Sequence, residues 1–331
     1  MLFSEFIGQE EIKEYLKTSI IDGEVSHAYI FDGPKGAGKF DLAYLFAQSI
    51  LCKDFNGEPC NLCTNCIKVN TNNYPDIHIV LPQKGKTIKV GDVEAVIESI
   101  GQKSYEGGKK IYIFKNSEMI GTEAANKLLK TLEEPLGDTV IILLTENIDL
   151  LLPTIVSRCQ ILKFTSLKDE IIADYLNKNY NIDIKKAKLI SGYSKGVMNN
   201  AISIIEGKND ILELRNEVLG LYDKLITGKR DVLSEYEDFF EKRRNQMKDI
   251  VEILCIWLMD LLYERNDLEE LVVNTDKIDL IYKHINLVST DNINNDIAYL
   301  QRVVVDVKMS VNYKLVISNM LIKLQEERFR W

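Results

Sequence analysis

The chain has 331 residues, enough for two or three domains with a sizeable core. Its formal net charge is -9 and it has no long basic tract, which argues against a protein that binds DNA or RNA by itself. The first residues lack the pattern of a signal peptide, and the apolar run Ile253–Met259 is far too short to span a bilayer. We therefore expect a cytoplasmic protein without membrane contacts.

Short apolar runs alternate with amphipathic helical patterns through the first half of the chain. In Glu123–Glu133, apolar residues follow the i, i+3, i+4, i+7 spacing of one helix face, with Thr122 as the expected N-cap and Pro135 as the stop. Strands that alternate with helices predict a parallel sheet covered on both faces. The expected strands are Ala28–Phe31, Ile77–Val80, Ile111–Phe114, Val140–Leu144 and Ile161–Phe164.

A loop after the first expected strand has the pattern that binds nucleotide phosphates. The sequence GPKGAGK, from Gly33 to Lys39, is followed by a helical pattern, as this motif requires. Backbone N–H groups around Gly33, Gly36 and Gly38 would surround a phosphate, and Lys39 would reach the outer phosphates. The sequence therefore predicts a nucleotide-binding fold.

The groups that ATP hydrolysis needs are missing from this pattern. Phe40 stands where a Ser or Thr hydroxyl would coordinate magnesium. After the strand Ile111–Phe114, Lys115 and Asn116 stand where an acidic pair is expected, and Glu118 is expected to point elsewhere. We therefore expect no intrinsic ATPase activity, and nucleotide binding that is weak or absent.

Four of the six cysteines are clustered just after the first helical pattern of the loop. Cys52, Cys60, Cys63 and Cys66 have spacings at which four thiolates can surround one zinc ion and leave no open position for chemistry. In a reducing compartment, such a cluster predicts metal ligands rather than disulfides. A structural zinc site in an insertion, residues 52–66, is therefore expected.

The strand patterns end near Phe164. Short helices are expected over Leu167–Ile205, with a break near Tyr193–Gly196, and long helices from about Asp210 onward. The nearly all-apolar segment around Trp257 is typical of a helix inside a bundle.

Several motifs together resemble one family. The chain is similar to the delta-prime subunits of the bacterial DNA polymerase III clamp loader, in the AAA+ superfamily, and the match is specific up to about Phe164. The residues that carry the resemblance are His27-Ala28-Tyr29 before the degenerate loop, the four-cysteine insertion, Asn126–Pro135, Leu152–Ile155, Ser157-Arg158-Cys159 and the weaker string Val311–Leu315.

The resemblance implies a fold of three parts. Residues 1–164 would form the α/β AAA+ nucleotide-binding domain, a parallel sheet flanked by helices that carries the zinc insertion. Residues 165–207 would form a small helical lid, in which Asn199 stands where AAA+ lids often have a sensor arginine. Residues 208–331 would form an all-α collar domain that joins other subunits in a ring.

The resemblance also implies a role in DNA replication. The delta-prime subunit does not hydrolyse ATP, and its Ser-Arg-Cys arginine, here Arg158, is presented in trans to the ATP site of a neighbouring motor subunit. The implied partners are the gamma/tau motor subunits and the delta subunit, with the sliding clamp and primer-template DNA contacted through the complex. A guanidinium delivered in this way can stabilise the charge on a transferring phosphoryl group.

The residues also bear on two alternative functions. An active motor ATPase of the same loader would need Ser or Thr at position 40 and acidic residues near 115–116, and the chain has neither. A zinc-dependent nucleic-acid-binding protein fits poorly with the acidic composition and with a cysteine insertion inside an α/β fold.

Overall fold

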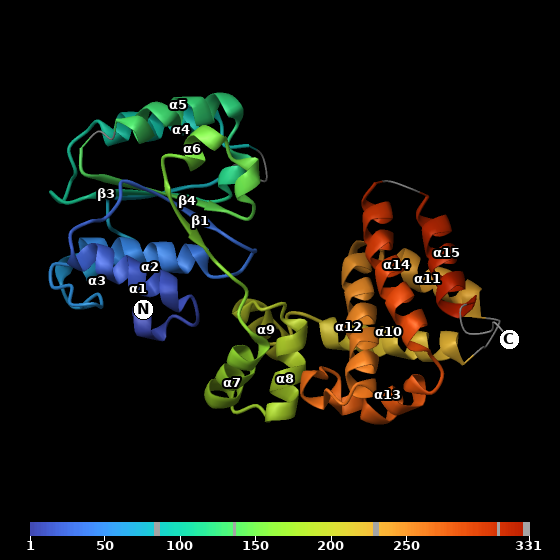
Figure 1. Ribbon diagram of the computed structural model, residues 1–331. Coiled ribbons are helices and arrows are strands. Elements are labelled where there is room, and N and C mark those ends of the chain that lie inside the picture. The colour runs from blue at the N-terminus through green and yellow to red at the C-terminus, as the bar shows by residue number, and fades with distance from the viewer. Residues whose placement is uncertain (83–86, 135–136, 228–231, 310–311, 327–331) are drawn as a thin grey trace. The chain divides into compact units, whose positions relative to one another are not determined.

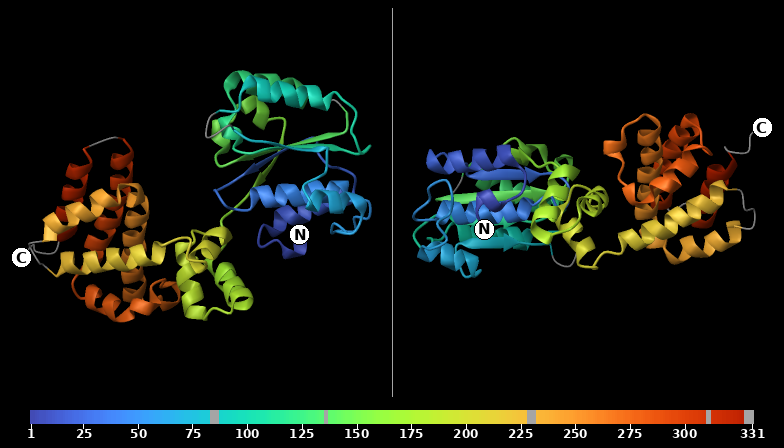
Figure 2. Two further views of the ribbon diagram at one scale, coloured as in Figure 1. Left: turned by 180° about the vertical axis from the view of Figure 1, so that it is seen from behind. Right: turned by 90° about the horizontal axis from the view of Figure 1, so that it is seen from below.

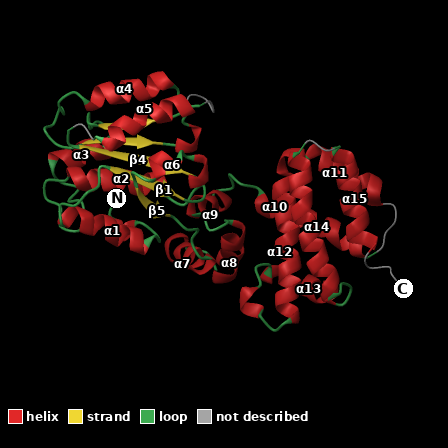
Figure 3. Cartoon of the chain, turned by 45° about the horizontal axis from the view of Figure 1, so that its top comes forward, coloured by secondary structure: helices red, strands yellow, loops and turns green. Residues whose placement is uncertain are grey.

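The chain forms two compact units in the computed structural model (Figure 1). The first unit consists of Met1–Lys168 with Gly196–Met198, and the second of Asp169–Lys195 with Asn199–Trp331. The described strands all lie in the first unit, whereas the second is helical (Figure 3). None of the helices in the described part of the chain is long and apolar enough to cross a membrane. The structure describes residues 1–82, 87–134, 137–227, 232–309 and 312–326.

The first unit is built on a five-stranded parallel sheet with the order β2-β3-β4-β1-β5. This confirms the predicted parallel sheet, and each expected strand is present with ends shifted by no more than one residue. Residues buried on both faces of a parallel sheet form continuous apolar runs, which is why the sequence revealed them. The strands are β1 (Ala28–Asp32), β2 (Ile77–Val80), β3 (Lys110–Phe114), β4 (Thr139–Thr145) and β5 (Gln160–Lys163).

Helices cover both faces of the sheet (Figures 1 and 2). Alternate residues of one strand face opposite layers: Tyr29 and Phe31 pack in the core with α1 and α2, and Ala28 and Ile30 in the core with α4 and α5. The sheet is therefore the middle layer of three. The helices of this unit are α1 (Glu10–Ile21), α2 (Lys39–Leu51), α3 (Thr64–Asn70), α4 (Val90–Ile100), α5 (Thr122–Glu133) and α6 (Pro153–Val156).

The start of α5 differs from the expectation. Thr122 is the first helical residue, and Gly121, in an extended conformation, takes the N-cap position. An N-cap residue keeps non-helical backbone angles, and Thr122 already has helical ones, so the predicted cap was wrong by one position. The helix ends at Glu133, and the predicted stop, Pro135, lies outside the described residues, as does Val311 of the last family string.

The second unit packs helices around a long apolar helix, as the pattern near Trp257 predicted. Trp257 is fully buried in α12, where its Nε1 donates a hydrogen bond to Nδ1 of His284, whose Nε2 lies 2.9 Å from an Asp223 carboxylate oxygen. The helices are α7 (Asp169–Tyr180), α8 (Ile184–Tyr193), α9 (Met198–Ile205), α10 (Ile211–Ile226), α11 (Val232–Lys242), α12 (Met247–Arg265), α13 (Ile278–Ile285), α14 (Thr290–Lys308) and α15 (Tyr313–Glu326). The boundaries of a separate lid at 165–207 stay a prediction.

Candidate functional site

The topology gathers the loop segments of the nucleotide-type site at one edge of the sheet. Because all five strands are parallel, the segments that follow β1, β3 and β4 leave the sheet at its carboxyl edge. Asp32, at the end of β1, is in register with Thr145, at the end of β4. The phosphate-type loop, Lys115 and Glu146 therefore lie at this edge, where open α/β sheets bind their ligands.

The loop from Gly33 to Gly38 has the backbone that its glycines predict. Gly36 and Gly38 have φ angles of 81° and 80°, in the left-handed region that other residues avoid. Apolar side chains also lie directly against both glycines: an added Cβ would lie 2.5 Å from Val197 Cγ1 at Gly36, and 2.6 Å from Phe6 Cζ at Gly38. The loop thus keeps its conformation while Val197 and Phe6 pack closely against it.

The loop lysine, Lys39, is the first residue of α2 and is buried. Its ammonium donates hydrogen bonds to the loop's own carbonyl oxygens, at 2.5 Å to Gly33 and 2.8 Å to Pro34. Burial lowers the pKa of Lys39, whereas the carboxylates of Glu146, Glu118 and Asp32 act to raise it. The lysine is therefore held inside its own loop, in the field of three acidic groups.

The involvement of Glu118 was not foreseen from the sequence. The expectation was that this side chain points elsewhere, but it interacts electrostatically with Lys39. One of its carboxylate oxygens is buried and has no hydrogen-bond partner among the described residues. Glu118 belongs to the 3-10 turn Ser117–Met119, which follows β3. Residue spacing alone does not reveal that this turn brings Glu118 within electrostatic range of Lys39.

Phe40 and Lys115, which stand where the sequence pattern predicts magnesium-binding groups, contact each other. The Lys115 ammonium lies over the Phe40 ring, 3.1 Å from its centroid. Burial lowers the pKa of Lys115, and Asp41 acts to raise it; burial in turn raises the pKa of Asp41. A cation and an aromatic ring thus occupy the positions at which the hydroxyl and carboxylate ligands of a metal were expected.

The four cysteines of the insertion meet at one point. Their sulfur atoms all lie within 4.8 Å of one another, and all four are free thiols. A tetrahedron of sulfurs around zinc, with Zn–S bonds of about 2.3 Å, has edges of about 3.8 Å. Cys52 is the C-cap of α2, Cys63 is the N-cap of α3 and Cys66 lies in its first turn, so both helices fix the cluster. These four residues are close enough to hold a metal ion.

Backbone N–H groups surround the sulfurs in a way that suits thiolates. Those of Cys60, Cys63 and Cys66 donate to the sulfurs of Cys52, Cys60 and Cys63, at 3.3, 3.3 and 3.4 Å. Burial opposes ionisation of Cys63, but the hydrogen bonds that it accepts outweigh burial and lower its pKa to about 6, whereas burial raises the pKa of Cys52 and of Cys66. Such donors stabilise the anionic form that binds metal.

Arg158 lies two residues after α6 and two residues before β5. Its side chain is 35% exposed, and its Nη2 is 2.6 Å from Oε1 of Glu133, the last residue of α5. Nη1 donates to the carbonyl oxygen of Thr154 at 2.8 Å. The partner Glu133 was part of the family motif but had no predicted role.

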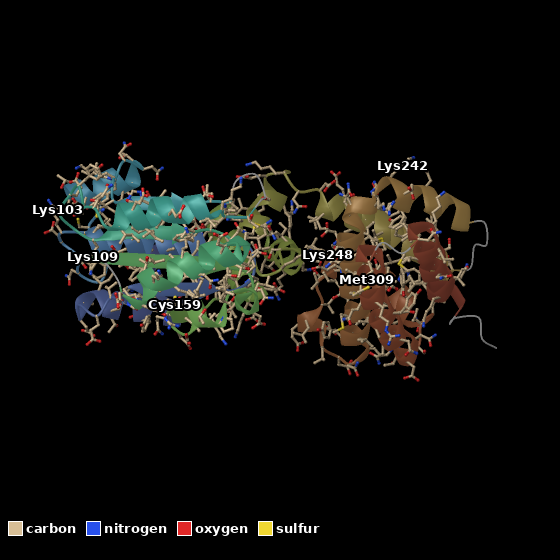
Figure 4. All side chains as sticks on the ribbon, turned by 90° about the horizontal axis from the view of Figure 1, so that it is seen from above. Lys103, Lys109, Cys159, Lys242, Lys248 and Met309 are labelled. Carbon is tan, nitrogen blue, oxygen red and sulfur yellow. The ribbon has the colours of Figure 1, made fainter. Side chains whose placement is uncertain are left out.

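Cys159, labelled in Figure 4, follows Arg158 and is partly buried. Burial raises the pKa of its thiol to about 12, which disfavours the thiolate form. The structure thus brings together the loop glycines and Lys39, and separately the four cysteines. Arg158 precedes β5, at the amino edge of the sheet, opposite the carboxyl edge that carries the loop.

Known proteins match both halves of the chain. The family model described as DNA polymerase III, delta subunit, matches residues 8–168, and the model described as DNA polymerase III, delta subunit, C terminal, matches residues 209–326. The DNA polymerase III subunit delta' of Bacillus subtilis is 32% identical over 324 residues, which cover 96% of each chain. The DNA polymerase III subunit tau of the same bacterium is 26% identical and covers 86% of this chain and 54% of its own. A solved DNA polymerase III gamma subunit-related protein of Thermotoga maritima is 16% identical, with a TM-score of 0.48, over 96% of this chain and 99% of its own.

Proposed function

The chain belongs to the family of DNA polymerase III delta-prime subunits, and on that premise we propose that it is a clamp-loader subunit that does not hydrolyse ATP. It would work in the cytoplasm, in a hetero-oligomeric ring with gamma/tau motor subunits and a delta subunit, and help to load the sliding clamp onto primed DNA. The net charge of -9 fits a subunit that meets DNA through the complex rather than alone.

The observation that carries the proposed lack of hydrolysis is the contact between Phe40 and Lys115. Magnesium bridges the outer phosphates and neutralises developing charge in phosphoryl transfer, and it needs oxygen ligands from the protein. Here an aromatic ring and an ammonium fill those positions. The acidic groups around Lys39 add to this, because without magnesium they repel a triphosphate. The loop residues Gly33, Gly36, Gly38 and Lys39 are therefore a vestigial nucleotide site.

The same chain would complete the ATP site of a neighbouring motor subunit with Arg158. Its guanidinium is partly exposed and lies at the end of a short helix, where a second subunit can reach it. A planar guanidinium can form two parallel hydrogen bonds to phosphate oxygens, which makes it suited to sense and stabilise a neighbour's nucleotide.

The four-cysteine cluster would hold one structural zinc ion. The residues are Cys52, Cys60, Cys63 and Cys66, and thiolate ligands with short separations favour zinc in a closed tetrahedral site. Bound zinc would fix the turn between α2 and α3. The helical segment 165–207 would act as a lid, and residues 208–331 as a collar that joins other subunits.

ATP turnover by the purified full chain tests the proposed lack of hydrolysis. We expect no turnover above background with or without magnesium, under conditions in which a motor subunit of the same loader is active. Robust magnesium-dependent turnover by this chain would overturn the proposal.

That outcome would favour the second candidate, an active motor ATPase. The specific observation in its favour is the intact backbone of the phosphate-type loop, with left-handed Gly36 and Gly38 and a lysine at the start of α2. The similarity to a tau subunit is a second point.

A further inference from the structure

The guanidinium of Arg158 is already bound within its own chain. Nη2 lies 2.6 Å from Oε1 of Glu133, and Nη1 donates to the Thr154 carbonyl oxygen at 2.8 Å and to Ser157 Oγ at 3.3 Å. Both terminal nitrogens are therefore in use, and they are the groups with which arginine grips a phosphate. To reach a phosphate outside the chain, Arg158 has to exchange these partners.

The exchange requires little more than a movement of side chains. Glu133 is the last residue of α5, and Arg158 follows α6 by two residues, so both side chains stand at helix ends. Thr154 and Ser157 belong to the same turn as Arg158. Only Glu133 comes from a separate helix, and its carboxylate is the one full negative charge in this set of partners.

The ion pair is exposed enough to be exchanged. The side chain of Arg158 is 35% exposed and that of Glu133 is 48% exposed. Ion pairs in such positions are weak, because water screens the charges and both long side chains lose conformational freedom. A triphosphate in a neighbour's site carries more negative charge than one carboxylate and offers the same fork-like geometry. It can therefore displace Glu133, whereas an empty site cannot.

We propose that Glu133 is a positioning residue that holds Arg158 against its own chain and releases it when a neighbouring subunit presents bound ATP. We call the orientation in which Arg158 is bound to Glu133 the parked orientation. This inference rests on the proposed role of Arg158 in trans. In the parked orientation the carboxylate neutralises the guanidinium, so Arg158 adds no net attraction to an empty site. Breaking the contact with Glu133 lowers the apparent affinity of the neighbouring site for ATP. Removal of the Glu133 carboxylate therefore makes it easier for Arg158 to bind the nucleotide.

The test uses the loader reconstituted from this chain with its motor and delta subunits. We compare wild type, Glu133→Gln and Glu134→Gln, each also combined with Arg158→Ala. The Arg158-dependent rate is the total turnover minus the rate of the matching Arg158→Ala complex. Glu134 is a matched control because it adjoins Glu133, has the same charge, is exposed, and forms no ion pair in the described part of the chain.

For Glu133→Gln we expect the Arg158-dependent kcat/KM for ATP to rise about 1.5- to 5-fold, mainly through a lower KM, since exposed ion pairs are worth that much. Glu134→Gln should leave it unchanged, and in the Arg158→Ala background Glu133→Gln should change nothing. A purely structural role of Glu133 would lower turnover and the melting temperature instead.

The outcomes separate this inference from the function on which it rests. If Arg158→Ala lowers turnover but Glu133→Gln leaves kcat/KM unchanged or lowers it, the parking role is wrong and the proposed function stands. If Glu133→Gln raises turnover equally in the Arg158→Ala background, the effect does not pass through Arg158, and the parking role is again wrong. If Arg158→Ala has no effect on turnover, the proposed role of Arg158 is wrong, and the role of Glu133 that rests on it is wrong as well.

Discussion

The phosphate-type loop and the Arg158 segment belong to the same α/β unit but differ in how their charged groups are held. At the loop, the Lys39 ammonium binds carbonyl oxygens of its own loop, and Lys115 lies over Phe40. Lys39 is buried, and Lys115 and Phe40 are half-buried. Arg158 is instead one-third exposed and paired with a carboxylate that is about half exposed.

The difference separates groups that would act within the chain from a group that would act on a neighbour. A phosphate site that works in its own chain needs free lysine, hydroxyl and carboxylate groups at the edge of the sheet. Here those positions are filled by internal contacts. An arginine that works in trans needs a fixed backbone position and an exchangeable partner; here Arg158 follows α6, and its partner Glu133 ends α5.

The largest effect is expected at Arg158. Arg158→Lys in the reconstituted loader should lose most of the contribution of the arginine, because lysine keeps the charge but loses the planar fork. Arginine fingers are worth about 10³–10⁵ in rate at a single site. The total loss will be smaller, because only the motor site that faces this chain is affected. Steady-state ATP turnover measures it, and a fully active Arg158→Lys complex would contradict the fork as the working feature.

The second largest effect is expected from loss of zinc, and it should be confined to the insertion. We expect one zinc ion per chain and its loss in Cys66→Ser. Structural zinc contributes on the order of 10 kcal/mol in small peptide modules. Glu58, within the insertion, accepts hydrogen bonds from the N–H groups of Phe3 and Ser4. Loss of zinc should loosen the insertion and break these hydrogen bonds, while the sheet stays folded.

Elemental analysis and limited proteolysis between residues 52 and 66 measure this prediction. Circular dichroism should change little on loss of the metal. Carefully reduced protein that contains no zinc would rule out the metal site.

A smaller effect is expected for the contact between Lys115 and Phe40 next to the phosphate-type loop. Lys115→Met keeps an apolar stem of similar length but removes the cation from the Phe40 ring and from Asp41. We expect the free energy of unfolding to fall by about 0.5–1 kcal/mol. The control is Lys103→Met at an exposed position (labelled in Figure 4), which should have no effect. Equal effects of the two variants, measured by chemical denaturation, would show that the contact adds no stability.

No gain is expected from repairing one position of the loop. Phe40→Thr restores the hydroxyl but leaves Lys115 and Asn116 in place of the acidic pair, and catalytic groups that act together do not recover singly. Turnover by Phe40→Thr should therefore stay at background. Clear magnesium-dependent turnover in this variant would show that the loop is one substitution away from an active site.

Sequence patterns predicted the sheet, the loop and the cysteine cluster because each depends on residues close together in the chain. Apolar runs marked the buried strands, and short spacings marked the four cysteines. The contacts of Lys115 with Phe40 and of Arg158 with Glu133 were not predicted. Both join separate segments, and such contacts depend on strand order and on helix ends. The sequence did contain a signal for the contact between Lys115 and Phe40, because neither position has the residue type expected of a magnesium-binding site.

ATP turnover of the reconstituted loader, measured side by side with Lys39→Ala and with Arg158→Ala, tests the central claim most directly. If the chain's own loop is vestigial and Arg158 acts in trans, Lys39→Ala should leave turnover nearly unchanged and Arg158→Ala should cut it, with assembly intact in both. If Lys39→Ala cripples turnover and Arg158→Ala does not, the chain is a motor subunit and the assignment of the two regions is reversed.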